Sequence, residues 1–306
     1  MLITPSQYCG QDCQKSHWTA HKTDCKAPVG QKSWVPAWVR EKREPAFIGD
    51  APPAHFGGFK YLWGNVPAFD ILQLGSNEGD HYKLPLSLLF AGAWGILIPF
   101  LFLCGDAGTD TAAASGDLRN IVTTIAGLPS SYSQPVEITI NDKDLDIVAR
   151  NAIMLLIVLI VDNTELAVDC IIHIWYSALI RKSDLDILQQ QIRPLIEDVC
   201  GKIKDKAPGS VMAKTWQFGQ RSLRLVLEKS SWHRLLSFAA IPKGLTAEEA
   251  NLVRRTVTLA ESRKDYRDRH FLFQAPSVRI AKQRFREDGL LLPFGCQRDE
   301  FREPNP

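Results

Sequence analysis

The stretch that decides the fold is VEITINDKDLDIVARNAIMLLIVLIV, residues 136–161. Its first five residues, 136–140, form a short apolar run bounded by turn residues, which is typical of a buried strand. Asp142 and Asp144 then stand where a helix over 145–161 would have its N-cap. Because the second half of that helix is apolar on nearly every face, we expect it to lie inside a domain.

Similar strand and helix patterns recur upstream of this stretch. Residues 69–74 and 86–91 are short, apolar and bounded by turn residues, and 117–126 has a helical pattern. This alternation predicts parallel strands joined by crossover helices, an α/β fold with a Rossmann-like sheet and a largely helical C-terminal part. Further helices are predicted over 165–180, over 185–204 with a bend at Pro194, over 222–239, and after Thr246, with Glu249 in capping-box position.

Composition and charge exclude several classes of protein. Hydrophobic residues make up 45% of the 306 residues, enough for a substantial core, so the chain is not a disordered tail. Lys and Arg total 36 against 34 Asp and Glu, and the net charge of +2 comes with no long single-sign block, so no nucleic-acid partner is expected. The scattered cysteines fit a reducing compartment, the cytoplasm or the nucleus.

Metal-binding residue types cluster near the N-terminus, in YCGQDCQKSHWTAHKTDC, residues 8–25. Cys9 and Cys13 are four residues apart, and so are His21 and Cys25. Zinc takes about four thiolate or imidazole ligands in a tetrahedron, and this spacing brings the two members of a pair to one side of a helical turn or tight loop. The sequence therefore predicts that these four residues bind zinc.

This phrase resembles the second half of MYND-type zinc fingers. The resemblance implies two cross-braced zinc ions, the first held partly by Cys9 and Cys13 and the second partly by His21 and Cys25. Each ion would take its other two ligands from upstream Cys-x-x-Cys motifs. Residues 1–8 contain none, so we expect the natural protein to carry an upstream segment that supplies them. The resemblance also implies protein partners, with proline-rich peptides docking at the finger.

The rest of the chain divides by composition. A partial finger at 1–27 is followed by a proline-rich linker at 28–58 and an α/β domain at 59–306. Within that domain, 92–113 is expected to be an insertion. Residues 84–105 carry no charge and have the length of a membrane span, but their prolines and glycines and the lack of positive flanking charge favour the insertion.

Five sequence blocks in the domain carry a second resemblance. In this order they resemble a domain of unknown function found in fungal MYND-finger proteins, which is itself similar to the N-terminal region of dynein axonemal assembly factor three. That resemblance implies a scaffold or assembly factor. The blocks are WGNVPAFDILQL, SGDLRNIVTTIAGLP, INDKDLDIVARNAIMLL, HIWYSAL and FREDGLLLPFG.

An enzyme is the competing interpretation, more specifically a degenerate or active S-adenosylmethionine-dependent methyltransferase. Gly116 would form the glycine turn after a strand, and Asp142, at the end of another strand, would bind a ribose hydroxyl. However, Gly116 is alone in its loop, and Asp142 suits a helix cap. His173 is expected to be a packed core residue, and 263–295 a salt-bridged surface helix and loop. The sequence therefore favours a zinc-binding adaptor over an enzyme.

Overall fold

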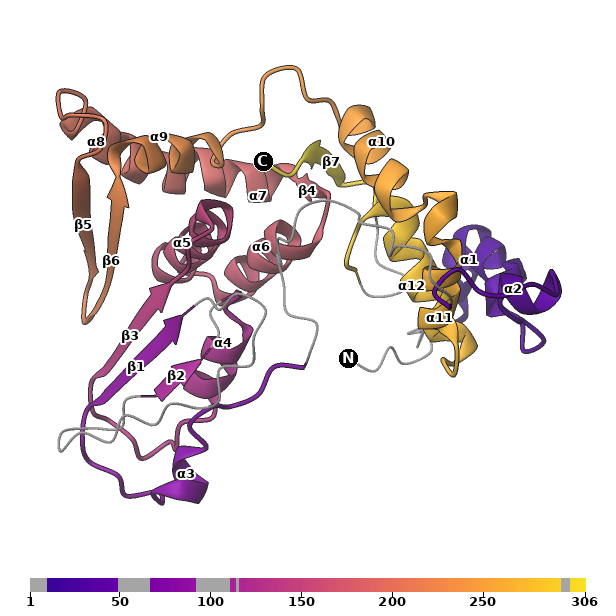
Figure 1. Cartoon of the computed structure of the whole chain (residues 1–306), viewed down its shortest axis with the longest axis horizontal. Helices are drawn as coiled ribbons and strands as arrows, with labels where there is room; N and C mark the ends of the chain where they lie inside the picture. The colour runs from indigo at the N-terminus through magenta and orange to yellow at the C-terminus, as the bar shows by residue number, and fades with distance from the viewer. Residues whose placement is uncertain (1–9, 49–66, 92–110, 114–115, 293–297) are drawn as a thin grey trace. The chain divides into compact units, whose positions relative to one another are not determined.

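The computed structural model of the chain is a mixed α/β structure in which helices account for about half of the described residues. The residues that it describes are 10–48, 67–91, 111–113, 116–292 and 298–306. Two compact units are present, the sheet unit, residues 57–156 with 223–225, and the helical unit, which comprises 1–56, 157–222 and 226–306. Figure 1 labels the helices and strands of both units.

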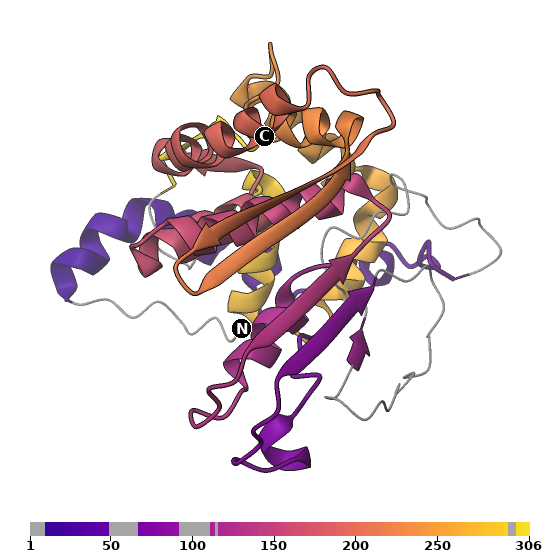
Figure 2. The same cartoon turned by 90° about the vertical axis from the view of Figure 1, so that its left-hand side faces the viewer.

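The sheet unit is built on three parallel strands in the order β2-β1-β3 (Figures 1 and 2). β1 (Leu86–Ala91) pairs with β3 (Val136–Asn141) along its whole length and with β2 (Thr111–Ala113) on its other side. Leu86 and Phe90 of β1 are buried. The strands predicted over 86–91 and 136–140 are therefore confirmed, and so is the mixed α/β class.

Two helices follow the strands as predicted. α4 (Arg119–Ala126) connects β2 to β3, and α5 (Leu145–Ile160) follows β3. Met154 and Leu156 are fully buried, which confirms that α5 lies inside the protein. β2 occupies the last three residues of the expected insertion at 92–113, and 92–110 lie outside the described residues.

The strand predicted over 69–74 is wrong. Within the described part of the chain, 69–73 take no sheet partner, and α3 (Leu74–Asn77) begins inside this range. The backbone N–H of Phe69 donates to Asn120 Oδ1 at 3.3 Å, and that of Ile71 donates to Thr124 Oγ1 at 3.1 Å. Because side chains of α4 satisfy these backbone donors, the segment runs across that helix instead of extending the sheet.

After α5, the next helix along the chain is α6 (Thr164–Tyr176), in the helical unit. A helix was predicted over 165–180, and α6 ends before Ile180. The chain then enters β4 (Leu179–Arg181), which pairs antiparallel with β7 (Phe301–Pro304) near the C-terminus. The helix predicted over 185–204 is present, with a π-helical segment before Pro194, where the bend was expected. Its parts are α7 (Lys182–Asp186), a π-helix (Ile187–Ile192) and α8 (Arg193–Lys202).

The helix predicted over 222–239 is only partly correct. Residues 211–228 form a hairpin of β5 (Val211–Phe218) and β6 (Arg221–Glu228), and only α9 (Lys229–Ser237) is helical. Gly219 in the turn has a φ of 60°, a left-handed conformation that glycine adopts without strain. Trp216 of β5 packs edge-on against Trp232 of α9, with ring centroids 6.0 Å apart.

The last helices of the chain lie against its first ones. Thr246 and Glu249 form the predicted capping box, which is confirmed by hydrogen bonds of 3.1 and 2.8 Å between each side chain and the other residue's backbone. The C-terminal helices are α10 (Ala247–Thr258), η3 (Glu261–Arg263), α11 (Lys264–Phe271) and α12 (Pro276–Asp288). The N-terminal ones are α1 (Gln11–Lys26), η1 (Pro28–Gly30) and α2 (Ala37–Arg40).

Arg279 of α12 holds the N-terminal segment in place. Its guanidinium donates to the carbonyl oxygens of Val29 and Gln31 at 2.6 and 2.7 Å, and to that of Gln274 at 2.6 Å. It also lies over the ring of Trp34, 5.1 Å from the centroid. Residues 28–48 of the expected linker therefore pack against α11 and α12.

No helix in the described part of the chain is both long and apolar enough to cross a bilayer. Residues 86–91 of the candidate span at 84–105 form β1, and 92–105 lie outside the described residues.

Replacing Arg279 tests whether the N-terminal segment depends on this contact. Arg279→Met removes hydrogen bonds from a buried charged donor, so we expect the free energy of unfolding to fall by about 3 kcal/mol. Residues 10–48 should then be cleaved faster by thermolysin. Arg40→Met is the control, because Arg40 is exposed and makes only a 3.8 Å ion pair with Glu41. Equal cleavage of the two variants would contradict the proposed role of Arg279.

Candidate functional site

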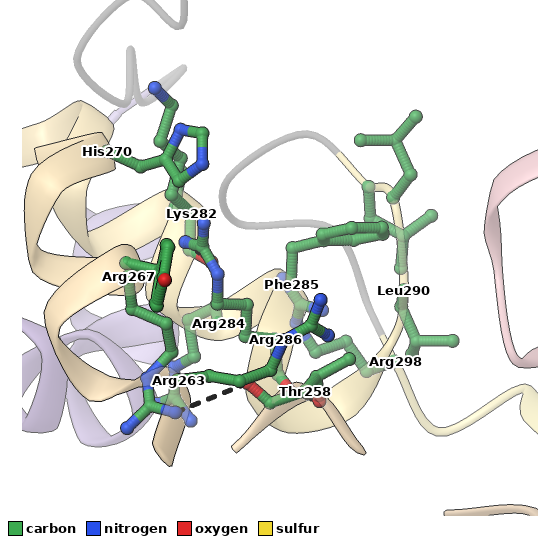
Figure 3. Close-up of a pocket in the computed structure, with 14 residues that line it drawn as sticks. Thr258, Arg263, Arg267, His270, Lys282, Arg284, Phe285, Arg286, Leu290 and Arg298 are labelled. Carbon is green, nitrogen blue, oxygen red and sulfur yellow. Dashed lines mark hydrogen bonds between the residues drawn. The ribbon is translucent and has the colours of Figure 1, made fainter. Parts of the chain in front are cut away.

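The helical unit contains a cavity of about 420 Å³ between the end of α10, α11, α12 and the residues that follow α12 (Figure 3). Its volume lies in the range of small-molecule sites, about 300–1,000 Å³. Cationic residues dominate the lining. They are Arg263, Arg267, Lys282, Arg284, Arg286 and Arg298, together with His270.

No carboxylate lines this basic pocket within the described part of the chain. Arg284 pairs with Asp24 of α1 at 2.7 Å, and Arg298 pairs with Asp288 at 2.5 Å, so two of the cations are neutralised from outside the pocket. Arg267 donates instead to a neutral acceptor, the carbonyl oxygen of Ala260, at 2.7 Å.

The remaining cations lie close enough to raise one another's energy. Burial lowers the pKa of Lys282, and the positive charge of Arg286 lowers it further. The same causes, burial first, lower the pKa of Arg286, where the neighbouring charges are Arg267 and Arg263. His270 also has a lowered pKa, mainly through burial and then through Arg286 and Lys282. Like charges gathered in a partly buried site favour a bound anion.

One wall of the pocket is apolar. Figure 3 shows Phe285 and Leu290 on one side of the site, with Arg263 and Arg267 on the other. Leu291 and Leu292 extend the apolar side. The pocket can therefore bind a ligand that carries negative charge at one end and an apolar or aromatic group at the other.

The predicted zinc ligands are only partly covered by the structure. Cys9 lies outside the described residues, as do the side chains of the other three, whose backbone belongs to α1. Cys13 and Cys25 are twelve residues apart on this continuous helix, which separates their backbones by about 18 Å at 1.5 Å per residue. Zinc–ligand bonds are about 2.0–2.3 Å, so these two residues cannot hold the same ion. Outside these ligands, the described residues contain no cluster of three metal-binding side chains.

Gly116 and Asp142 both lie beyond the carboxyl ends of parallel strands, Gly116 after β2 and Asp142 after β3. The structure thus places them at one edge of the sheet, as the methyltransferase interpretation requires. Both are engaged in local structure. The Gly116 carbonyl oxygen accepts a hydrogen bond from Arg150 Nη2 at 3.0 Å, and Asp142 Oδ1 accepts one from the backbone N–H of Asp144 at 2.9 Å, just before α5.

A second polar cluster surrounds the buried carboxylate of Asp184. His173 Nδ1 lies 2.8 Å from Asp184 Oδ2, and Arg181 Nη2 lies 3.1 Å from Oδ1. Burial alone would raise the pKa of Asp184, but the hydrogen bonds from His173 and Arg181 lower it. The neighbouring thiol of Cys170 is a poor nucleophile because burial raises its pKa to about 12. His173 is buried, as expected, and this cluster is a structural one.

The sequence interpretation missed the basic pocket because it treated 263–295 as a salt-bridged surface. The sequence nevertheless contains a signal for the pocket, in the spacing of its basic residues. Arg263 and Arg267 are four residues apart on η3 and α11, and so are Lys282 and Arg286 on α12. Helices stabilised by surface ion pairs place opposite charges at this spacing, whereas like charges there are unfavourable.

Comparison with known proteins identifies one domain. Residues 62–180 match a family described as a domain of unknown function (DUF4470). The match includes the parallel sheet and ends within β4, so it excludes the basic pocket. No curated protein and no solved structure matches the chain.

Replacing Asp184 tests the structural role of its cluster. Asp184→Ala leaves the partly buried Arg181 and the buried His173 without their common partner, so we expect unfolding in urea to show a loss of about 3–5 kcal/mol. Because the pKa of Asp184 is lowered on folding, its contribution is fully present above about pH 4 and is lost as the pH falls further. Asp169→Ala, which removes the exposed partner of Arg181 at 3.3 Å, should cost under about 1 kcal/mol. Similar losses in both variants would contradict a special role for Asp184.

Proposed function

We propose that this protein is a zinc-binding interaction adaptor of scaffold or assembly-factor type, in preference to an enzyme. The observation that carries the proposal is the docking of α1, which bears three of the four predicted zinc ligands, onto α12. Asp24 of α1 pairs with Arg284 at 2.7 Å, and Arg279 holds the segment that follows. A metal module attached in this way forms a continuous binding surface with the C-terminal helices.

The length of α1 favours two zinc ions over one. Cys13 and Cys25 lie too far apart for a shared ion, so Cys9 with Cys13 and His21 with Cys25 would each serve a separate site. This is the cross-braced arrangement of MYND-type fingers, and each site then needs two further ligands from upstream residues.

Protein segments rich in proline are the proposed partners at the finger. Trp18 of α1 has 48% of its surface exposed, and an exposed aromatic ring is the kind of group on which extended proline-rich segments pack. The buried free thiols Cys170 and Cys200 support a cytoplasmic or nuclear location.

The sheet unit is proposed to be a Rossmann-like scaffold. Its three parallel strands and the β2-α4-β3 crossover support this assignment. A methyltransferase is the alternative, and the position of Gly116 and Asp142 at the carboxyl edge of the sheet is the observation that favours it. Against it, Asp142 caps the turn before α5, and Asp117, which follows Gly116, is paired with Arg119 at 2.9 Å and so is also engaged at the start of a helix.

Metal content tests the finger. The whole chain extended upstream by two Cys-x-x-Cys motifs should retain two zinc ions after dialysis against a weak chelator, whereas the chain without the extension should bind zinc weakly. Cys25→Ser in the extended chain should lower the content to one ion, and Cys200→Ser, which alters a buried thiol far from α1 in sequence, should not. Two tightly bound ions without the extension would contradict the need for upstream ligands. No zinc with the extension would overturn the MYND assignment.

Calorimetric titration with S-adenosylmethionine tests the alternative. We expect no saturable binding to the whole chain, because Gly116 and Asp142 are held in local hydrogen bonds. Asp142→Ala should lower stability by about 1 kcal/mol through loss of the turn, with no effect on the titration. Saturable micromolar binding that Asp142→Ala abolishes would make the methyltransferase the better interpretation.

A further inference from the structure

The basic pocket has a charge imbalance that the packing of the protein does not require. Among its cations, Arg284 and Arg298 have carboxylate partners, which shows that α12 and the residues after it can recruit acids where the fold needs them. Lys282 and Arg286 have no such partner among the described residues. The side chain of Arg286 lies over the Phe271 ring, 5.0 Å from its centroid, and so keeps its charge.

This arrangement costs stability in the free protein. Lys282 and Arg286 are four residues apart on one helix, and Arg263 and Arg267 face the same cavity from η3 and α11. Each lies near at least one like charge in partly buried surroundings, where water screens the repulsion less than at an open surface. A cluster of like charges persists in a fold when a bound ligand of opposite charge offsets the repulsion within the cluster.

The chemistry of the side chains indicates phosphate. A guanidinium presents parallel N–H groups that match two oxygens of one phosphate, and an ammonium adds a compact point charge. The guanidinium groups of Arg267 and Arg286 and the ammonium of Lys282 together can balance more negative charge than a single carboxylate carries.

The size and the apolar wall define the rest of the ligand. A cavity of about 420 Å³ is of a size that suits a small molecule, and the net charge of +2 is far from the strongly basic balance typical of nucleic-acid-binding domains. Phe285 and Leu290 offer an apolar contact on the side of the pocket away from Arg263 and Arg267, which a purely ionic ligand would leave unused (Figure 3).

We propose that the basic pocket binds an organic polyphosphate of the nucleoside triphosphate class, with the phosphates at Arg263, Arg267, Lys282 and Arg286 and the base against Phe285 and Leu290. This site is separate from the zinc sites, so it stands whether or not the finger binds metal.

The test uses the whole chain, at fixed ionic strength without divalent metal, and three probes: ATP, inorganic tripolyphosphate and adenosine. ATP should bind saturably in calorimetric titration and raise the melting temperature. Tripolyphosphate should bind at least tenfold more weakly, and adenosine should not bind measurably. Tripolyphosphate binding as tightly as ATP would overturn the assignment of the apolar wall, and lack of saturable binding by both would overturn the site.

Lys282→Gln separates a binding role from a structural one. Removing one of the mutually repelling cations should raise the melting temperature of the free protein and weaken ATP binding at least tenfold, two effects of opposite sign. Lys243→Gln makes the same charge change at an exposed turn residue and should alter neither. A lower melting temperature with unchanged ATP affinity in Lys282→Gln would show that Lys282 is structural and would overturn the proposal.

Discussion

The helical unit depends on one guanidinium. Arg279 is buried, and its three nitrogens donate to carbonyl oxygens of Val29, Gln31 and Gln274, which come from segments about 250 residues apart in the chain. A buried charge is tolerated only when its donors are satisfied, so the N-terminal segment and α12 need each other. This mutual need explains why a proline-rich stretch expected to be a linker packs instead against the C-terminal helices.

Helix α12 places its positive charges in two different environments. Arg279 and Arg284 are fully matched by carbonyl oxygens or by a carboxylate, and they connect elements of the fold. Lys282 and Arg286 face the basic pocket, where burial and neighbouring positive charges lower the pKa of each. Matched and unmatched cations occur within eight residues of one helix, so a shortage of acidic residues does not explain the pocket. Ligand binding explains the positions of Lys282 and Arg286 better than a role in folding does.

The sequence predicted correctly the elements that depend on interactions between residues close together in the chain. The apolar run of β3, the helix that follows it and the capping box of Thr246 and Glu249 each depend on neighbours in sequence. Elements defined by distant partners were missed, among them β4, which exists only because β7 pairs with it. The hairpin over 211–228 was missed because the apolar residues at 223, 226 and 227 in β6 also have the spacing of one face of a helix, and only the pairing with β5 decides. The pocket was missed for a related reason, since the meaning of like charges on a helix depends on which other helices surround them.

The pairing of Asp24 with Arg284 joins the two candidate sites. Asp24 precedes the predicted zinc ligand Cys25 on α1, and its carboxylate is mostly shielded from solvent while it neutralises a cation that lines the basic pocket. Movement of α1 away from α12 would leave Arg284 without this partner and make the pocket more positive. The DUF4470 match at 62–180 includes neither α1 nor α12, so the contact between these helices lies outside the matched domain.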